Sequence, residues 1–223
     1  MNNIKLSASK LNLLRECPRC FWLAMVKNLK RPSRPMSSIP IKMDSIIKQY
    51  YNTYRIQNEL PPILNGQVDG QLAVNMPMTL QWQEAKGVTI WGRPDDYFLF
   101  QSGAVVPLDH KTKSRPPDEI HPAYQLQLDV YSYLLRMNGF KTVNKGLLAY
   151  YCPNNGNLHN GMPLQCTVKE VITDPEHVIS MIHQARNILR EPMPEPGTYC
   201  QFCKWTQDLI DNTSVRMSRG RCI

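Results

Sequence analysis

One stretch of the sequence, GRPDDYFLFQSGAVVPLDHK from Gly92 to Lys111, constrains the fold more than any other. An aromatic and apolar run at 97–100, turn-forming residues at 101–103 and a second apolar run predict two adjoining strands. Successive side chains of a strand face opposite ways, so Asp109 and Lys111 project together while His110 points elsewhere. With Asp95 at the start of the first strand, two carboxylates and an ammonium are expected to converge on one spot.

This group of side chains suits phosphodiester hydrolysis. Carboxylate oxygens are hard ligands for Mg²⁺ or Mn²⁺. The ion makes hydroxide available near neutral pH and neutralises charge in the transition state, and a lysine can orient the attacking water. The tripeptide Asp109-His110-Lys111 alone is weak support, because D-x-K recurs by chance in most chains. The alternative interpretation is a solvated ion pair at an exposed strand end.

Three segments in order carry a family resemblance. GRPDDYF, an apolar strand ending LDHKT, and QLDVY resemble motif II, motif III and the QxxxY signature of the RecB-like PD-(D/E)XK nucleases, a group that includes Cas4 and the AddB-type nuclease domains. The resemblance implies an α/β fold with a mixed β-sheet flanked by helices. It also implies a catalytic role for each matching residue: the motif II acid, the (D/E)xK pair and the QxxxY pair are Asp95, Asp109, Lys111, Gln127 and Tyr131.

The resemblance further implies a divalent-metal site. Its ligands would be Asp95, Asp109 and the backbone carbonyl of His110, holding Mg²⁺ or Mn²⁺. RecB-like nucleases usually add a histidine from an earlier helix. A helix is predicted here from about Lys42 to Arg55, and by position it offers Asp44 instead. Asp44 could bind a hard cation, or it could be a helix-start aspartate favoured by the helix dipole.

The cysteines predict a second metal site. The chain has seven, an odd number that argues against a disulfide framework, and four of them form the pairs CPRC and CQFC. In Cas4-like and AddB-type nucleases the two chain ends meet at a cysteine-bound cluster. The resemblance therefore implies a [4Fe-4S] cluster that joins segments 1–30 and 192–210. The ligands would be Cys17, Cys20, Cys200 and Cys203.

Two alternatives stay open for this site. Zn²⁺ also accepts four thiolates, and sequence spacing cannot separate it from a [4Fe-4S] cluster. The family commonly has one N-terminal and three C-terminal cysteines, whereas this chain has two and two, so Cys222 is an alternative ligand. Cys152 and Cys166 are expected to be small core residues.

The whole chain is interpreted as one nuclease domain spanning residues 1–223, with residues 211–223 as a disordered tail. A helix is expected from about Pro122 to Asn138, with Gln127 and Tyr131 on its edge. Strands are expected at 145–151 and 165–172, and a further helix from Asp174 to about Arg190.

The net charge and the hydropathy of the chain limit the kinds of partner that are expected. A formal net charge of +8 and a pI near 9.2 favour an acidic polymer, with DNA first and an anionic membrane surface second. The sequence lacks an amphipathic Lys/Arg helix with an apolar face, so no membrane partner is expected. The chain has neither an apolar run of 18 residues nor a signal-peptide core, so a soluble, cytoplasmic protein is expected.

Two functional hypotheses follow. The first is a metal-dependent deoxyribonuclease, an exonuclease acting on single strands or DNA ends, with protein partners in CRISPR adaptation or recombination repair. The second is a catalytically inactive nucleic-acid-binding or scaffold subunit, which the departure at Asp44 motivates.

Overall fold

The computed structural model describes residues 4–32, 37–84 and 87–219. They form two compact units. One comprises Met1–Ala8 and Pro35–Met181, and the other comprises Ser9–Arg34 and Ile182–Ile223. The two units are described separately below.

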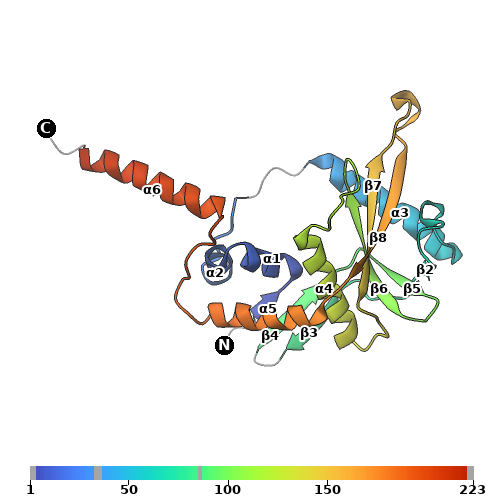
Figure 1. The fold of residues 1–223 in the computed structure, drawn as a ribbon, viewed down its shortest axis with the longest axis horizontal. Helices are drawn as coiled ribbons and strands as arrows, with labels where there is room; N and C mark the ends of the chain where they lie inside the picture. The colour runs from blue at the N-terminus through green and yellow to red at the C-terminus, as the bar shows by residue number, and fades with distance from the viewer. Residues whose placement is uncertain (1–3, 33–36, 85–86, 220–223) are drawn as a thin grey trace. The chain divides into compact units, whose positions relative to one another are not determined.

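The centre of the first unit is a five-stranded mixed sheet in the order β2-β5-β6-β7-β8 (Figure 1). Strands β6 and β7 are parallel, and the other neighbouring pairs are antiparallel. The hairpin predicted from the sequence is β5 and β6, in which Asp96 pairs with Leu108. The strands are β2 (Gly70–Leu72), β5 (Asp96–Phe100), β6 (Val105–Thr112), β7 (Lys145–Pro153) and β8 (Leu164–Ile172).

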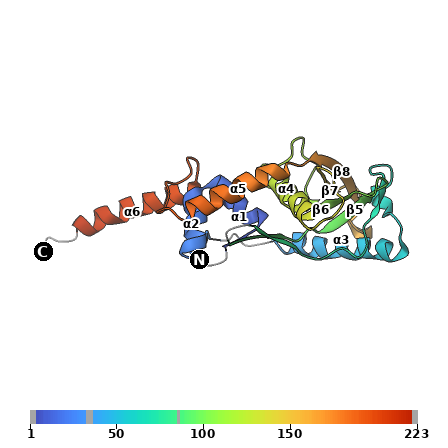
Figure 2. The ribbon, with the colours of Figure 1, turned by 90° about the horizontal axis from the view of Figure 1, so that it is seen from below.

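Two helices cover opposite faces of this sheet, α3 (Ser38–Gln57) on one and α4 (Pro122–Met137) on the other (Figure 2). Ile47 and Tyr51 of α3 belong to a core cluster with Phe98, Val106 and Leu108 of the hairpin. On the α4 face, Gly146 of β7 allows close approach, since a Cβ there would lie 3.0 Å from the Leu128 side chain. Because Leu108 faces α3, the neighbouring Asp109 is directed to the α4 face.

A three-stranded sheet in the order β1-β4-β3 adjoins α4 in the same unit. Its strands are β1 (Ile4–Leu6), β3 (Leu80–Glu84) and β4 (Val88–Gly92), with β1 parallel and β3 antiparallel to β4. The Tyr133 hydroxyl of α4 donates a hydrogen bond to the Glu84 carboxylate of β3 at 2.5 Å. Strand β1 was not predicted. The unit also contains two short 3₁₀ helices, Pro62–Leu64 and Leu158–Asn160.

The second unit is helical. It contains α2 (Pro18–Val26), α6 (Gln201–Arg219) and, apart from Ala8, α1 (Ala8–Glu16), while α5 (Pro175–Ile188) runs from the first unit into the second. Cys17 follows the last residue of α1 and is the N-cap of α2, so the break predicted at CPRC lies where expected.

The C-terminal segment differs from its expectation. The sequence favoured a disordered tail from residue 211, whereas α6 continues through Arg219, and residues 220–223 lie outside the described part of the chain. Phe202, Trp205 and Leu209 recur at spacings of three and four, which is a helical period that the polar composition of the segment conceals. In the part of the chain that the structure describes, no helix is both long and apolar enough to cross a membrane.

Candidate active site and cysteine site

Strand β6 brings Asp109 and Lys111 together, as the alternation of side chains predicts. The Asp109 side chain is 2% exposed, and its Oδ2 forms an ion pair with the Lys111 ammonium. Lys111 Nζ also lies 4.4 Å from the centroid of the Tyr124 ring, a cation–π distance. The pair is buried, so the alternative of a solvated ion pair at an exposed strand end does not describe it.

Asp95 lies just before β5, beside the end of β6. Its Oδ2 accepts a hydrogen bond from the backbone N–H of His110 at 3.1 Å, and its Oδ1 lies 3.2 Å from Lys48 Nζ. Burial raises the pKa of Asp109 to about 6. The positive charge of Lys111 opposes this rise, and the nearby Asp95 carboxylate adds to it. The two carboxylates are therefore close enough to interact, as the sequence predicted.

The QxxxY pair holds the lysine. Gln127 and Tyr131 lie one turn apart on α4, and Gln127 Oε1 accepts a hydrogen bond from Lys111 Nζ at 3.0 Å. Gln127 Nε2 donates to the Tyr131 hydroxyl at 2.9 Å, and that hydroxyl donates to the backbone carbonyl of Arg93 at 3.0 Å. A continuous relay of hydrogen bonds thus connects β6, α4 and the segment preceding Asp95. Direct contact of this pair with DNA stays a prediction.

Helix α3 contributes a residue that the sequence interpretation missed. Lys48 Nζ lies 2.9 Å from the carboxylate of Asp44 as well as 3.2 Å from Asp95. Asp44 is half exposed and reaches Asp95 only through this lysine. Among the described residues, the four cysteines are the one group of three or more side chains placed to share a metal ion. Metal ligation by Asp44 stays a prediction.

A second contact from α3 was also missed. The Arg55 guanidinium pairs with both carboxylate oxygens of Asp96, the residue after Asp95. The sequence carried a signal for both contacts, because Asp44, Lys48 and Arg55 lie on one helical stripe at spacings of four and seven.

His110 points to the opposite face from Asp109, as predicted. Its imidazole is buried, with ring centroids 4.5 Å from Tyr51 and 5.6 Å from Tyr151. Burial lowers the pKa of His110, although the nearby Asp95 and Asp96 carboxylates oppose this, so the ring is neutral at pH 7. The proposed metal contact of its backbone carbonyl stays a prediction.

Asp95 borders an open pocket of about 340 Å³ within the first unit. Lys48, Arg55 and Arg93 also border it, so an anionic ligand that reaches Asp95 meets three basic side chains. Asp109 is not part of the pocket lining. Asp95 is therefore the accessible carboxylate of the pair, and Asp109 the buried one.

The cysteine pairs meet within the second unit, as the sequence predicted. Cys17 is the N-cap of α2 and Cys20 lies in its first turn, while Cys200 and Cys203 lie at the start of α6. Gly197 contributes its backbone N–H to Cys17 Sγ at 3.2 Å, and a Cβ at this glycine would lie 2.5 Å from the Glu16 carbonyl oxygen. Only glycine fits this approach without a shift of the backbone.

The four sulfur atoms are closely spaced. Cys20 Sγ lies 3.6 Å from the sulfurs of both Cys200 and Cys203, Cys17 Sγ lies 3.7 Å from that of Cys203, and all four lie within 4.8 Å of one another. Four thiolates around one Zn²⁺ at about 2.3 Å form a tetrahedron with edges of about 3.8 Å. The donor set therefore fits one tetrahedral ion. Cys222, the alternative ligand, lies outside the described residues.

Electrostatics favour the thiolate form of Cys17. Burial alone would raise the pKa of Cys17, but the N–H groups of Gly197 and Cys20 outweigh it and lower the pKa to about 6. Arg31 Nη2 lies 3.5 Å from Cys200 Sγ, so a guanidinium adds positive charge beside the sulfurs. Metal binding needs deprotonated sulfur. Burial raises the pKa of Cys20 and of Cys203, so an ion that binds there must displace the protons of these two thiols.

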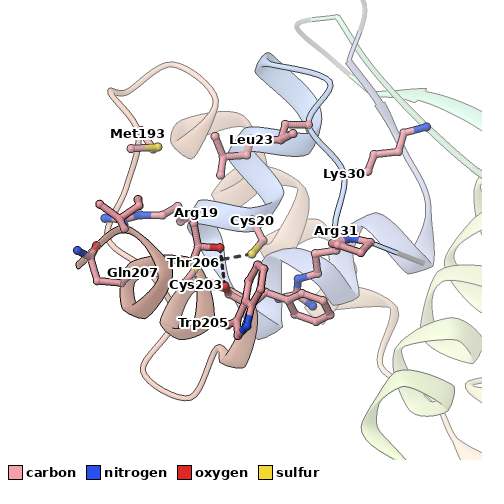
Figure 3. Close-up of a pocket in the computed structure, with 14 residues that line it drawn as sticks. Arg19, Cys20, Leu23, Lys30, Arg31, Met193, Cys203, Trp205, Thr206 and Gln207 are labelled. Atoms are coloured by element: carbon pink, nitrogen blue, oxygen red, sulfur yellow. Dashed lines mark hydrogen bonds between the residues drawn. The ribbon is translucent and has the colours of Figure 1, made fainter. Parts of the chain in front are cut away.

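A pocket of about 400 Å³ adjoins the cysteine site on the side of Cys20 and Cys203 (Figure 3). Its wall combines apolar side chains such as Leu23 and Trp205 with the Arg31 guanidinium, which lies 4.8 Å from the Phe202 ring.

Comparison with known proteins gives the family. The sequence profile of the PD-(D/E)XK nuclease superfamily matches residues 45–207, well over half of the chain and, except for Asp44, all of the candidate active site. This chain belongs to that superfamily. The matched range includes Asp95, Asp109 and Lys111, and the resemblance found in the sequence is confirmed at the superfamily level. No curated protein matches the chain significantly.

Solved structures with a similar chain path include three with low sequence identity. The protein titled SSO0001 is 14% identical with a TM-score of 0.46, and the match covers 87% of this chain and 80% of that one. LHK-Exo in complex with dAMP is 10% identical with a TM-score of 0.43, covering 94% and 93%. The alkaline exonuclease LHK-Exo from Laribacter hongkongensis is 10% identical with a TM-score of 0.42, covering 96% and 94%.

Proposed function

We propose that the protein is a metal-dependent DNA nuclease that hydrolyses phosphodiester bonds with Mg²⁺ or Mn²⁺. One observation carries the proposal: within a PD-(D/E)XK domain, Asp95 and Asp109 interact, and Lys111 is held beside them by Gln127. We further propose that it acts as an exonuclease on single-stranded DNA or DNA ends, in line with the Cas4-like and AddB-type resemblance of its motifs.

Each residue has a specific task in this proposal. The divalent ion would be held by Asp95, Asp109 and the His110 carbonyl. Asp95 borders the pocket, and Asp109 is buried and ion-paired with Lys111. The ion would supply hydroxide and neutralise charge on the phosphate. Lys111 keeps one ammonium at the site and orients water or phosphate, while Gln127 and Tyr131 fix its position.

Basic side chains around the pocket support DNA as the substrate. Arg93 is exposed at the pocket mouth, and Lys113, one strand position past β6, lies 5.5 Å from the Tyr124 ring. Together with the net charge of +8, they would contact phosphates and release counterions. Cleavage and binding should therefore weaken steeply as salt concentration rises.

We also propose that the cysteine site holds one Zn²⁺ rather than the [4Fe-4S] cluster that the family resemblance implies. In a cubane each thiolate binds a different iron, which needs wider sulfur spacing than one shared ion does. The 3.6–3.7 Å contacts support the single ion. Anaerobically purified protein should then contain about one zinc per chain and show no absorption from 300 to 500 nm. A brown protein with iron and inorganic sulfide would contradict this proposal.

Labelled oligonucleotides test the nuclease proposal. Single-stranded, blunt and recessed-end DNA are incubated with Mg²⁺ or Mn²⁺ and the wild-type protein, Asp109→Ala or Lys111→Ala. Lys42→Ala is a matched control, since this lysine of α3 is exposed and a spacing of two residues places it on the other side of the helix from Asp44. Cleavage by the wild type and the control, with loss in the other two, is expected. Full activity in either active-site variant would refute the assignment of that residue.

The contact between Lys48 and Asp95 favours one alternative function. A catalytically inactive DNA-binding or scaffold subunit would also retain this ion pair, because it does not need the Asp95 carboxylate for a metal ion. Binding without cleavage across both metals and all DNA forms would favour this alternative.

A further inference from the structure

Lys48 lies at the point where the candidate active site meets α3. Its ammonium contacts Asp44 at 2.9 Å, four residues earlier on the same helix, and Asp95 Oδ1 at 3.2 Å. The second Asp95 oxygen already accepts the His110 N–H. Both oxygens of the accessible carboxylate are therefore engaged within the protein.

A protonated lysine cannot take part in metal binding as a ligand. Its ammonium has three donors and no lone pair, and it repels a divalent ion at contact distance. An ion that binds Asp95 through Oδ1 must therefore move the Lys48 ammonium away. Lys48 is half exposed and borders the pocket, so its side chain has room to do so.

The charge balance shows what Lys48 contributes. Among the described residues, three cations are ion-paired with four carboxylates in this region, Lys48, Arg55 and Lys111 with Asp44, Asp95, Asp96 and Asp109, and Arg93 also borders the pocket. Arg55 is engaged by both oxygens of Asp96, and Lys111 by Asp109 and Gln127. Lys48 is the cation whose ion pairs link the α3 carboxylate of Asp44 with the accessible carboxylate of Asp95.

We propose that Lys48 is an internal counter-ion: it holds Asp95 while no divalent ion is bound, and the ion must displace its ammonium to bind. This inference rests on the proposed function for the existence of the ion site. It makes Lys48 a positioning residue that lowers the affinity of the free protein for the ion. Once displaced, the ammonium lies at the pocket, where a DNA phosphate is a new partner for it.

Mn²⁺ binding to the full-length protein, followed by electron paramagnetic resonance of the free ion, tests this directly. Lys48→Met should bind Mn²⁺ at least about tenfold more tightly than the wild type, because one positive charge has left the contact distance of a ligand. Lys42→Met is the matched control, with the same charge change on the same helix, and should shift the affinity less than about twofold. Adding Asp109→Asn to Lys48→Met should abolish the tight binding.

Two further arms keep the outcomes separate. If Lys48→Met does not fold, Lys48→Gln carries the same expectation with a polar side chain. Unchanged or weaker Mn²⁺ affinity in the folded variant, or an equal gain in Lys42→Met, would overturn the inference even if the wild type cleaves DNA. Conversely, a tenfold gain in a protein that cleaves none of the oligonucleotides would support the counter-ion and refute the nuclease.

Discussion

Replacing Asp109 by asparagine should stabilise the metal-free protein at neutral pH, although it removes a candidate catalytic residue. The pKa of the buried Asp109 is raised from 3.8 to about 6, even with Lys111 beside it. Ionising this carboxyl therefore opposes folding. A shift of about 2 units corresponds to about 3 kcal/mol at pH values above the folded-state pKa.

The sign and the pH window follow from linkage. A carboxyl whose pKa is higher in the folded state binds its proton more tightly there, so its contribution to stability is full below about pH 4 and is lost as pH rises through about 6. Asparagine resembles the protonated acid and does not titrate. The stability difference between Asp109→Asn and the wild type should be near zero at pH 4 and reach about 3 kcal/mol at pH 7.

Urea unfolding of both proteins from pH 4 to pH 8, in metal-free buffer, measures this difference. The cysteine site is identical in both proteins, so its contribution cancels. Excess Mg²⁺ should reverse the order at pH 7, because only the wild type retains both carboxylates. A difference that does not change with pH, or a less stable Asp109→Asn at every pH, would refute the reasoning.

Three further predictions test the surroundings of both sites. Gly92→Ala places a Cβ 2.7 Å from Tyr131 Cε1, so urea unfolding should show a loss of about 1–3 kcal/mol; no loss would mean that the ring shifts freely. Tyr131→Phe leaves the Gln127 amide and the Arg93 carbonyl without a partner, so oligonucleotide cleavage should slow by about 10- to 100-fold, and an unchanged rate would contradict this role. Cys200→Ser removes one of four thiolates, so metal analysis should show the bound metal lost, and the melting temperature should fall; retained metal would exclude this ligand set.

Local periodicity allowed much of the site to be predicted from the sequence. Alternation along one strand placed Asp109 and Lys111 together, and a spacing of four placed Gln127 and Tyr131 on one helix edge. The superfamily followed from the order of these motifs. Such features depend on backbone geometry over a few residues, which the sequence carries directly.

Tertiary structure alone decided the contacts between distant segments. Arg55 contacts Asp96, 41 residues away in the sequence, and Lys48 contacts Asp95. Both contacts depend on where along the sheet α3 packs. The sequence predicted Asp44 as the residue of α3 at the active site. It could show which residues share one face of α3, but not how that face is aligned with β5.

The cysteine site was also predicted in part from the sequence and determined in part by the tertiary structure. The two CxxC pairs predicted metal binding, and the family resemblance implied one shared four-thiolate site, but the distances between sulfurs come from how α2 and α6 pack. Those distances are the observation that supports the proposal of one ion over a cluster. Residue identity determines which ligands are offered, whereas packing determines their spacing, and metal selectivity depends on both.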